Sequence, residues 1–162
     1  MFDACGREIR YLRLSVTDRC NLRCRYCMPD GVPKCTHEEI LTYEAFLRLA
    51  ALFARCGIDT VRVTGGEPLV RKGVEQLVAG LKATPGIRKV TLTTNGILLA
   101  QQLPALQRAG LDGVNISLDT LDRAVFRRIT ARDEFDHVME GIRTALESGI
   151  PVKLNCVPQA GV

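Results

Sequence analysis

The sequence contains no long apolar run. Its most apolar window, LRLAALFA from Leu47, is interrupted by Arg48 and is far shorter than the roughly 20 residues that a membrane-spanning helix needs. The first ten residues, MFDACGREIR, lack the apolar core of a secretory signal peptide. We therefore expect no membrane partner and a cytoplasmic location.

The chain also lacks any Lys/Arg-rich segment with interleaved aromatic residues, a pattern typical of nucleic-acid binding. No nucleic-acid partner is expected. Twenty-two basic and 18 acidic residues give a formal net charge of +4, which suits a small anionic ligand. With 162 residues, 46% apolar and 25% charged, the chain has the composition of one globular domain with a sizeable core.

Short apolar runs alternate with stretches of helical periodicity, which predicts an α/β fold with parallel strands. Strands are predicted at residues 9–16, 59–66, 89–96, 113–119 and 152–157. Helices are predicted from Thr42 to Gly57, around residues 74–83, in a short segment with Pro104 in its first turn, and around residues 138–148. Either a doubly wound sheet or a barrel of βα units fits this order, and in both the polar residues just past the strand ends meet on one rim.

Three cysteines, Cys20, Cys24 and Cys27, lie close together in DRCNLRCRYC, with the spacing C-x3-C-x2-C. Thiols stay reduced in the cytosol, so seven cysteines favour metal binding or catalysis over disulfides. The other four are expected to be buried as small apolar residues: Cys5, Cys35, Cys56 and Cys156.

Thiolates in proteins hold zinc ions or iron–sulfur clusters. A zinc site normally adds a second ligand pair downstream, whereas here His37 is the only imidazole near the loop. A cubane cluster bound by three cysteines leaves one iron without a protein ligand, and a substrate or cofactor can bind there. The spacing favours a cluster, and a zinc site or a non-catalytic metal-binding fragment remains the alternative.

The C-x3-C-x2-C motif, with Tyr26 directly before its last cysteine, resembles the signature of the radical S-adenosylmethionine (SAM) enzymes. The resemblance implies a partial βα barrel and a [4Fe–4S] cluster on Cys20, Cys24 and Cys27. It also implies that SAM binds the open iron through its amino and carboxylate groups. An electron from the cluster then cleaves the sulfonium bond and releases a 5′-deoxyadenosyl radical. Tyr26 would contact the adenine.

A second motif, TGGEP at residues 64–68, follows the second predicted strand. Taken alone it is a Gly-Gly turn, although glycines permit close approach of a ligand and the Glu67 carboxylate is able to accept a bond from an ammonium group. The radical SAM family places this motif against the methionyl part of SAM. The resemblance therefore implies SAM contacts at Gly66 and Glu67, and Ser117 in NISLD matches a further SAM contact.

Longer segments resemble the GTP 3′,8-cyclase family of molybdenum-cofactor biosynthesis, from about Tyr11 to Val157. These are YLRLSVTDRCNLRCRYCMPDG, VRVTGGEPLVR, TLTTNG, AGLDGVNISLDTLD and VKLNCV. In that family, which consists of lyases, the radical removes the 3′ hydrogen of the GTP ribose. The sugar radical then attacks C8 of guanine and yields 3′,8-cyclo-7,8-dihydro-GTP. A radical SAM enzyme that modifies peptides or tetrapyrroles is the alternative.

This second resemblance implies GTP contacts at Arg13, Arg62, Thr93 and Lys153. The three cations suit a triphosphate, because guanidinium and ammonium groups bind polyanions. All three lie inside predicted strands of a parallel sheet. Such strands are normally buried on both faces, so a charge there needs a partner or a ligand.

Members of the cyclase family are about twice as long, and their second half carries another [4Fe–4S] cluster that binds guanine. We expect residues 1–162 to be the N-terminal part of a radical SAM core, about four βα units plus a fifth strand. This part lacks the C-terminal cluster domain and is expected not to complete the reaction alone. The open sheet edge would favour self-association. Further expected partners are an unidentified electron donor and a downstream cyclic pyranopterin synthase.

Overall fold

The computed structural model describes residues 2–27, 35–36 and 39–159. The strands are β1 (Tyr11–Ser15), β2 (Thr60–Thr64), β3 (Lys89–Thr94), β4 (Gly113–Ser117) and β5 (Val152–Asn155). The helices are α1 (Tyr43–Arg55), the 3-10 turn η1 (Pro68–Val70), α2 (Val74–Ala83), α3 (Leu99–Arg108), α4 (Arg123–Thr130) and α5 (Phe135–Glu147). No helix in this described part is both long and apolar enough to cross a membrane.

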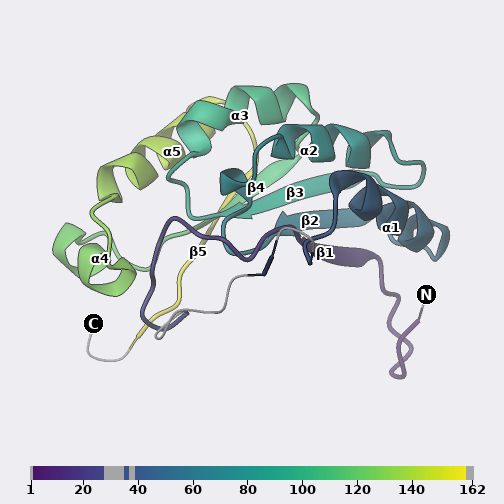
Figure 1. Ribbon diagram of the computed structural model, residues 1–162, viewed down its shortest axis with the longest axis horizontal. Helices are drawn as coiled ribbons and strands as arrows, with labels where there is room; N and C mark the ends of the chain where they lie inside the picture. The colour runs from purple at the N-terminus through teal and green to yellow at the C-terminus, as the bar shows by residue number, and fades with distance from the viewer. Residues whose placement is uncertain (1, 28–34, 37–38, 160–162) are drawn as a thin grey trace.

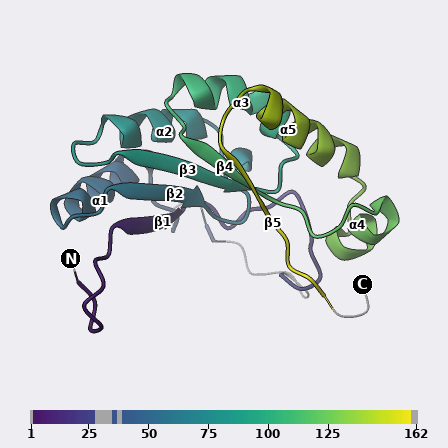
Figure 2. The same cartoon turned by 180° about the vertical axis from the view of Figure 1, so that it is seen from behind.

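The five strands form one parallel sheet in the order β1-β2-β3-β4-β5. Figure 1 shows α1, α2, α3 and α5 along one side of this curved sheet, and the view from behind in Figure 2 agrees. Sequential strand order with every crossover on the same side belongs to a βα barrel, since the strand order of a doubly wound sheet reverses at a switch point. The predicted partial α/β barrel is confirmed.

The core lies between the sheet and these helices. Alternate strand residues face it and are buried, among them Val61, Val63, Val90, Leu92, Val114 and Ile116. They pack in one cluster with the apolar stripes of the helices, which include Leu77, Leu81, Leu103, Leu106 and Val138. Each side chain of this size contributes about 1.5–3 kcal/mol when fully buried. The strands are therefore held by burial on one face.

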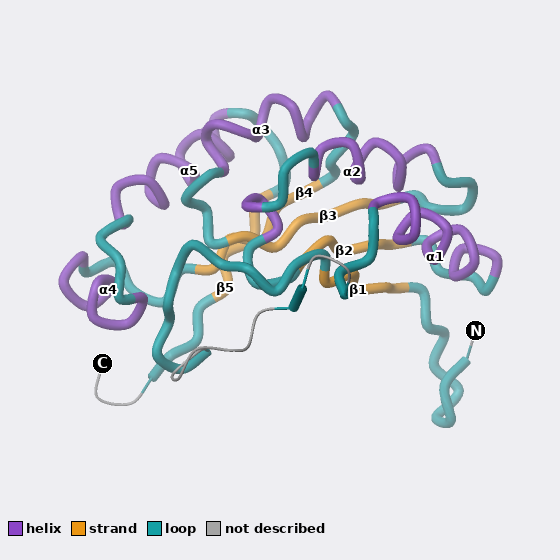
Figure 3. Tube along the Cα trace, in the orientation of Figure 1, coloured by secondary structure: helices purple, strands orange, loops and turns teal. Residues whose placement is uncertain are grey.

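The opposite face of the sheet carries the other alternate residues, which are largely polar. We expected Arg13, Arg62 and Lys153 to lie in strands buried on both faces, and this is wrong. The helices α1, α2, α3 and α5 cover one face, as Figure 3 shows, and α4 lies beyond the strand ends. Arg13 and Lys153 are consequently exposed, and Arg62 is only half-buried. Their charges face solvent on the concave side of the sheet, where a ligand can reach them.

Two helices differ from the sequence prediction. α3 begins at Leu99, so Pro104 lies inside the helix instead of in its first turn. The cause is the buried stripe of Leu99, Leu103 and Leu106, whose packing offsets the hydrogen bond that a proline removes. α4 was not predicted, because it is only eight residues long and its buried side chains are limited to Phe126, Ile129 and Thr130.

The strands and the remaining helices lie where the periodicity places them, with each strand two or three residues shorter than predicted. Thr42 caps α1 as expected, since its side chain accepts a hydrogen bond from the backbone N–H of Ala45 at 3.3 Å. β1 and β5 form the two edges of the sheet. Leu154 of β5 is exposed, in agreement with the expected open apolar edge.

The close packing of α5 on the loop after β3 is testable at Gly141. A Cβ at this position would overlap the carbonyl oxygen of Gly96, a backbone atom that cannot turn away. We expect Gly141→Ala to lower the free energy of unfolding by about 1–3 kcal/mol, in urea denaturation, because overpacking outweighs the gain in helix propensity.

Gly80→Ala in α2 is the matched control. Its Cβ would meet only the end of the Leu47 side chain, which can change rotamer. Both substitutions gain about 1 kcal/mol of helix propensity, so the control should be neutral or slightly stabilising. Equal midpoints for the two variants would contradict the packing described here.

Candidate functional site

A hollow opens where the carboxyl ends of the strands meet the loop that follows β1. Four segments that are distant in sequence line it, and α4 closes one side. The lining includes Cys20, Cys24, Tyr26, Cys27, Thr64, Gly65, Gly66, Glu67, Thr93, Thr94, Asn95, Ser117 and Asp119. The rim predicted from the strand ends is confirmed by this convergence.

The cysteine loop is held in place by backbone hydrogen bonds at both ends. Val16 N–H donates to the carbonyl of Thr64 at 2.9 Å, which ties the start of the loop to β2. Arg23 and Arg25 N–H donate to the carbonyls of Thr130 and Ile129, each at 3.0 Å, at the end of α4. The thiols of the loop are therefore carried on a backbone that two separate elements position.

The three thiols are free and lie close enough to influence one another electrostatically. Burial raises the pKa of Cys20, and burial together with the charges of Cys20 and Cys27 raises the pKa of Cys24 to about 11. Three thiolates side by side are thus unfavourable without compensating positive charge. Metal ions supply that charge, and ligand thiols lose their protons when the metal binds.

The donor set fits an iron–sulfur cluster. Within the described residues, no three His, Cys, Asp or Glu side chains are placed to hold a single metal ion. A cubane takes one thiolate at each of three separate irons, so its donors surround a volume and need not converge on one point. Three free thiols on one wall of the hollow meet this requirement. His37, the nearby imidazole, lies outside the described residues.

The glycine pair of TGGEP packs directly on the backbone of the cysteine loop. Gly66 N–H donates to the carbonyl of Thr17 at 2.7 Å, and Glu67 N–H donates to that of Arg19 at 2.8 Å. A Cβ at Gly66 would overlap the carbonyl oxygen of Arg19, and one at Gly65 would lie 2.5 Å from the carbonyl oxygen of Thr17. Glycine is needed at both positions so that the two loops can join as one wall of the hollow.

Glu67 is a buried carboxylate at the base of this wall, with 1% of its surface exposed. Its Oε1 accepts from Leu69 N–H at 3.0 Å and from the Thr94 hydroxyl at 2.8 Å, and its Oε2 accepts from Asn95 N–H at 2.6 Å. Burial raises the pKa of Glu67, and these three bonds oppose that rise. The carboxylate links the loop after β2 to the loop after β3. Its contact with SAM stays a prediction.

Tyr26, in the cysteine loop, lines the same hollow and is held by Asp119. Its hydroxyl donates to Asp119 Oδ2 at 2.7 Å, and Asp119 Oδ1 accepts from Val157 N–H at 3.0 Å. Burial and this hydrogen bond raise the pKa of Tyr26, so the phenol stays neutral. Asp119 had no predicted role, although its place just past the end of β4 was a signal that the sequence offered.

The residues predicted to contact GTP do not all lie in the hollow with the cysteines. Thr93 lines the hollow with the cysteines, whereas Arg62 and Lys153 line a second one on the open face of the sheet. The Arg62 guanidinium lies 5.3 Å from the centre of the Tyr11 ring, and its Nε donates to Thr91 Oγ1 at 3.4 Å. Among the described residues, neither Arg62 nor Lys153 forms an ion pair.

Strand register connects the two hollows. Thr93 pairs with Asn115, and Asn115 pairs with Lys153, so the three lie side by side across β3, β4 and β5. Arg13 pairs with Arg62 across β1 and β2 but lines neither hollow. Ser117 lies two residues beyond Asn115, in the hollow with the cysteines. A polar row thus leads from the hollow with the cysteines to Lys153.

The other cysteines are not buried, which corrects the sequence prediction. Cys5, Cys35, Cys56 and Cys156 are all exposed. They lie before β1, in the loop after it, at the end of α1 and after β5, outside the apolar stripes that form the core. None of the four lines the hollow described above.

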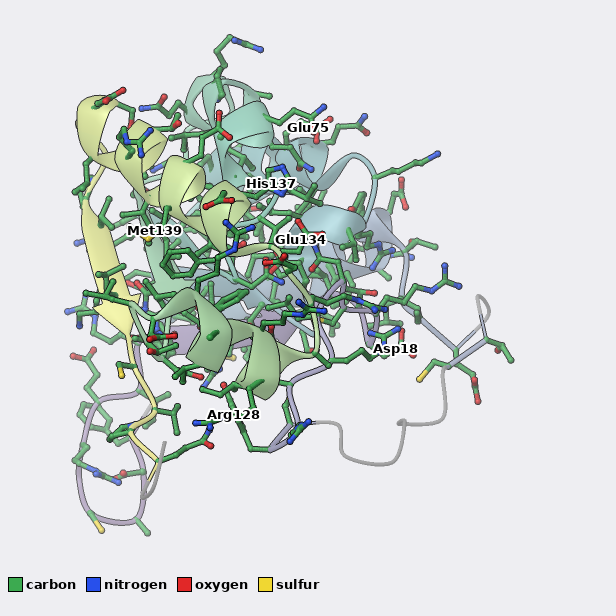
Figure 4. All side chains as sticks on the ribbon, turned by 90° about the vertical axis from the view of Figure 1, so that its left-hand side faces the viewer. Asp18, Glu75, Arg128, Glu134, His137 and Met139 are labelled. Carbon is green, nitrogen blue, oxygen red and sulfur yellow. The ribbon has the colours of Figure 1, made fainter. Side chains whose placement is uncertain are left out.

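A third hollow lies between the cysteine loop, α3 and α5, and its lining includes Asn21, Ile97, Glu134 and His137. Figure 4 shows Glu134 and His137 close together at the start of α5. The Glu134 carboxylate contacts His137 Nδ1, and this hydrogen bond raises the pKa of the imidazole. The sequence did not predict this pair, and it lies apart from the three thiols.

Comparison with known proteins agrees with this architecture. The chain is 55% identical over its whole length to the GTP 3′,8-cyclase of Heliobacterium modesticaldum and spans 50% of that protein. It is 54% identical, over 99% of its length, to molybdenum cofactor biosynthesis protein 1 of Mus musculus and spans 26% of it. The chain therefore spans half or less of the length of these relatives.

Among solved structures, Streptococcus suis SuiB bound to S-adenosylmethionine superposes with a TM-score of 0.79. The match covers 94% of this chain and 35% of SuiB, at 19% sequence identity, and shows a shared fold. The sequence model of the radical SAM superfamily matches residues 14–161, which include the cysteine loop, TGGEP and all five strand ends. By its sequence, its fold and its convergent site, the chain belongs to the radical SAM superfamily.

Proposed function

We propose that this chain is the N-terminal part of a GTP 3′,8-cyclase of molybdenum-cofactor biosynthesis, a radical SAM lyase. The observation that carries the proposal is the hollow itself. It joins three free thiols and the glycine pair to a polar row that ends at Lys153 of β5, and Lys153 lines the same second hollow as Arg62 of β2. A site for radical generation and a site for a polyanion are thereby adjacent on one surface. The identity to cyclases along the whole chain supports the same function.

In this proposal Cys20, Cys24 and Cys27 hold a [4Fe–4S] cluster with one iron left open for SAM. The bound cluster supplies the electron that cleaves the sulfonium bond of SAM. The protein's own contribution is to exclude water from one side of the thiols. Leu118, Phe126 and Ile129 also line the hollow, and their apolar surfaces shield a reactive radical from solvent.

SAM is proposed to lie along the wall between Tyr26 and the glycine pair. Tyr26 presents a neutral ring, held by Asp119, on which an adenine can stack. Gly66 lacks a side chain and its surface is exposed, so the methionyl part can approach its backbone. Ser117 is exposed at the end of β4 and offers a hydroxyl. Glu67 would act on the methionyl ammonium group as a buried negative charge at the base of the wall.

GTP is proposed to lie over the open face of the sheet. Arg13, Arg62 and Lys153 would bind the triphosphate, because guanidinium and ammonium groups form charge-assisted hydrogen bonds with phosphate oxygens. Thr93 would contact GTP between these cations and the thiols. A triphosphate explains three cations on one sheet face better than a peptide does, which disfavours the peptide-modifying alternative.

The proposal extends to the whole enzyme. Residues 1–162 are the N-terminal part of the radical SAM core, and a second half with its own cluster is required to hold guanine and complete the cyclisation. Further partners are an electron donor and a cyclic pyranopterin synthase that takes the product, in the cytoplasm. The exposed Leu154 and Val157 at the β5 edge favour self-association when nothing covers them.

Cysteine substitution tests the cluster site. We expect Cys24→Ala to abolish binding of iron and sulfide after anaerobic reconstitution, because one of only three thiolate donors is lost. Cys5→Ala, which removes an exposed thiol before β1, is the matched control and should retain the cluster of the unsubstituted chain. Iron and sulfide analysis with electron paramagnetic resonance (EPR) measures both. Retention of an unchanged cluster in Cys24→Ala would refute the assignment.

Removal of the Arg62 guanidinium tests the substrate site. Because a charged hydrogen bond contributes about 1.5–3 kcal/mol, Arg62→Ala should weaken GTP binding about tenfold or more and GMP binding much less. Equilibrium dialysis of the reconstituted chain at fixed ionic strength measures both affinities.

Arg108→Ala serves as the control, since Arg108 is an exposed cation at the end of α3 on the helical side of the sheet. Its removal should leave both affinities unchanged. Equal affinities for GTP and GMP that do not respond to Arg62→Ala would contradict a triphosphate site and favour the peptide- or tetrapyrrole-modifying alternative.

A further inference from the structure

Asn95 is the first residue after β3. Its side chain extends from the loop after β3 to the cysteine loop. Its Nδ2 donates to Asn21 Oδ1 at 2.7 Å and lies 3.9 Å from Cys20 Sγ, in hydrogen-bonding geometry. None of the roles assigned above to SAM or GTP binding involves this residue. Within the described part of the chain, its amide is the side-chain donor that is directed at one of the three thiols.

The orientation of this amide is determined by its other contacts. Asn95 Oδ1 accepts from Ile97 N–H at 3.1 Å, so the oxygen is turned away from the sulfur and the NH₂ group is turned toward it. A flipped amide would place two donors against each other at Ile97 and two acceptors against each other at Asn21. The direction of the N–H toward Cys20 is therefore consistent with all three partners.

Glu67 fixes the backbone from which this side chain extends. Its Oε2 accepts from Asn95 N–H at 2.6 Å, while its Oε1 binds the preceding residue through the Thr94 hydroxyl. Glu67 is almost fully buried, so the loop after β3 is held by a carboxylate that water does not reach. The chain of contacts runs from Glu67 through Asn95 to the sulfur of Cys20.

A donor at a thiolate sulfur changes the electron affinity of a cluster. The reduced cluster carries one more negative charge than the oxidised one, and an N–H dipole directed at a ligand sulfur stabilises that charge more strongly in the reduced state. Hydrogen bonds to the sulfurs are among the factors that set iron–sulfur potentials. Leu22 N–H also approaches Cys20 Sγ, at 3.4 Å, so this sulfur receives one backbone donor and one side-chain donor.

We propose that Asn95 is a positioning residue that, held by Glu67, directs an amide N–H at the Cys20 sulfur and raises the reduction potential of the cluster. The proposal rests on the cluster assignment made above. It assigns to the loop after β3 a function in electron uptake that is distinct from contact with SAM or GTP.

Asn95→Asp is the most direct test, because it keeps the size of the side chain and an acceptor for Ile97 but replaces the donor with a carboxylate. We expect the equilibrium constant for one-electron reduction of the reconstituted cluster to fall about tenfold, equal to about 59 mV for a one-electron couple. Asn95→Ala, which removes the donor without adding charge, should also lower this equilibrium constant. Redox titration followed by EPR measures the potential without any turnover.

Gln107→Glu is the matched control. It makes the same amide-to-carboxylate change at an exposed position of α3 and should leave the potential unchanged, since a solvated distant charge is screened. Thermal unfolding of each variant shows whether a change in the reduction potential is accompanied by a loss of folding stability. If both Asn95 variants lose stability but keep the potential of the unsubstituted chain, the role is structural and the proposal is wrong.

A second measurement needs no substitution. It tests whether an asparagine amide lies next to the cluster, even where a variant fails to hold the cluster. In the unsubstituted chain labelled with ¹⁵N in the asparagine side-chain amides, pulsed EPR of the reduced cluster should detect a weakly coupled ¹⁵N nucleus. Its absence would overturn the proposal even if the cluster is present. A chain that assembles no cluster at all would overturn the proposed function and this inference together, so the two failures are distinguishable.

Discussion

The candidate site depends on one packing contact, the junction of two loop backbones behind the thiols. The backbone N–H groups of Gly66 and Glu67 donate to carbonyls of the cysteine loop. A Cβ at Gly65 or Gly66 would prevent this close approach of the two backbones. Glu67 then turns inward and binds the next loop through the Thr94 hydroxyl and the Asn95 N–H. The loops after β1, β2 and β3 are thus joined without any metal, and a cluster bound there would meet a wall that is already assembled.

The second constraint is that the helices cover one face of the sheet. A parallel sheet with sequential strand order places its crossover helices on a single side, so every strand has one apolar and one available face. Burial of residues such as Val61 and Leu92 holds the sheet together. The other face can then carry Arg62 and Lys153 at little cost, since neither charge has to be desolvated in a core.

Much of the fold followed from periodicity. Apolar runs located all five strands, and glycines after apolar stripes located the ends of α1 and α5, because these signals are local. The start of α3 was misplaced because Pro104 looked like a first-turn residue, whereas the buried leucines around it decided otherwise. α4 was missed because it is short and because its hydrogen bonds with the cysteine loop are tertiary contacts. Four further cysteines are exposed because they lie outside the packed core, and the extent of the core is a tertiary property. They are Cys5, Cys35, Cys56 and Cys156.

By itself the sequence determined the chemistry that is available: three thiols at C-x3-C-x2-C spacing, a glycine pair, and cations at strand positions. These depend on residue type and spacing along the chain. Only the tertiary structure decided which side chains meet, because the partners are far apart in sequence. Asp119 reaches Tyr26 across 93 residues, and Asn95 reaches Cys20 across 75. Such contacts depend on which strands lie next to one another in the sheet, and the spacing of residues along the chain does not give that order.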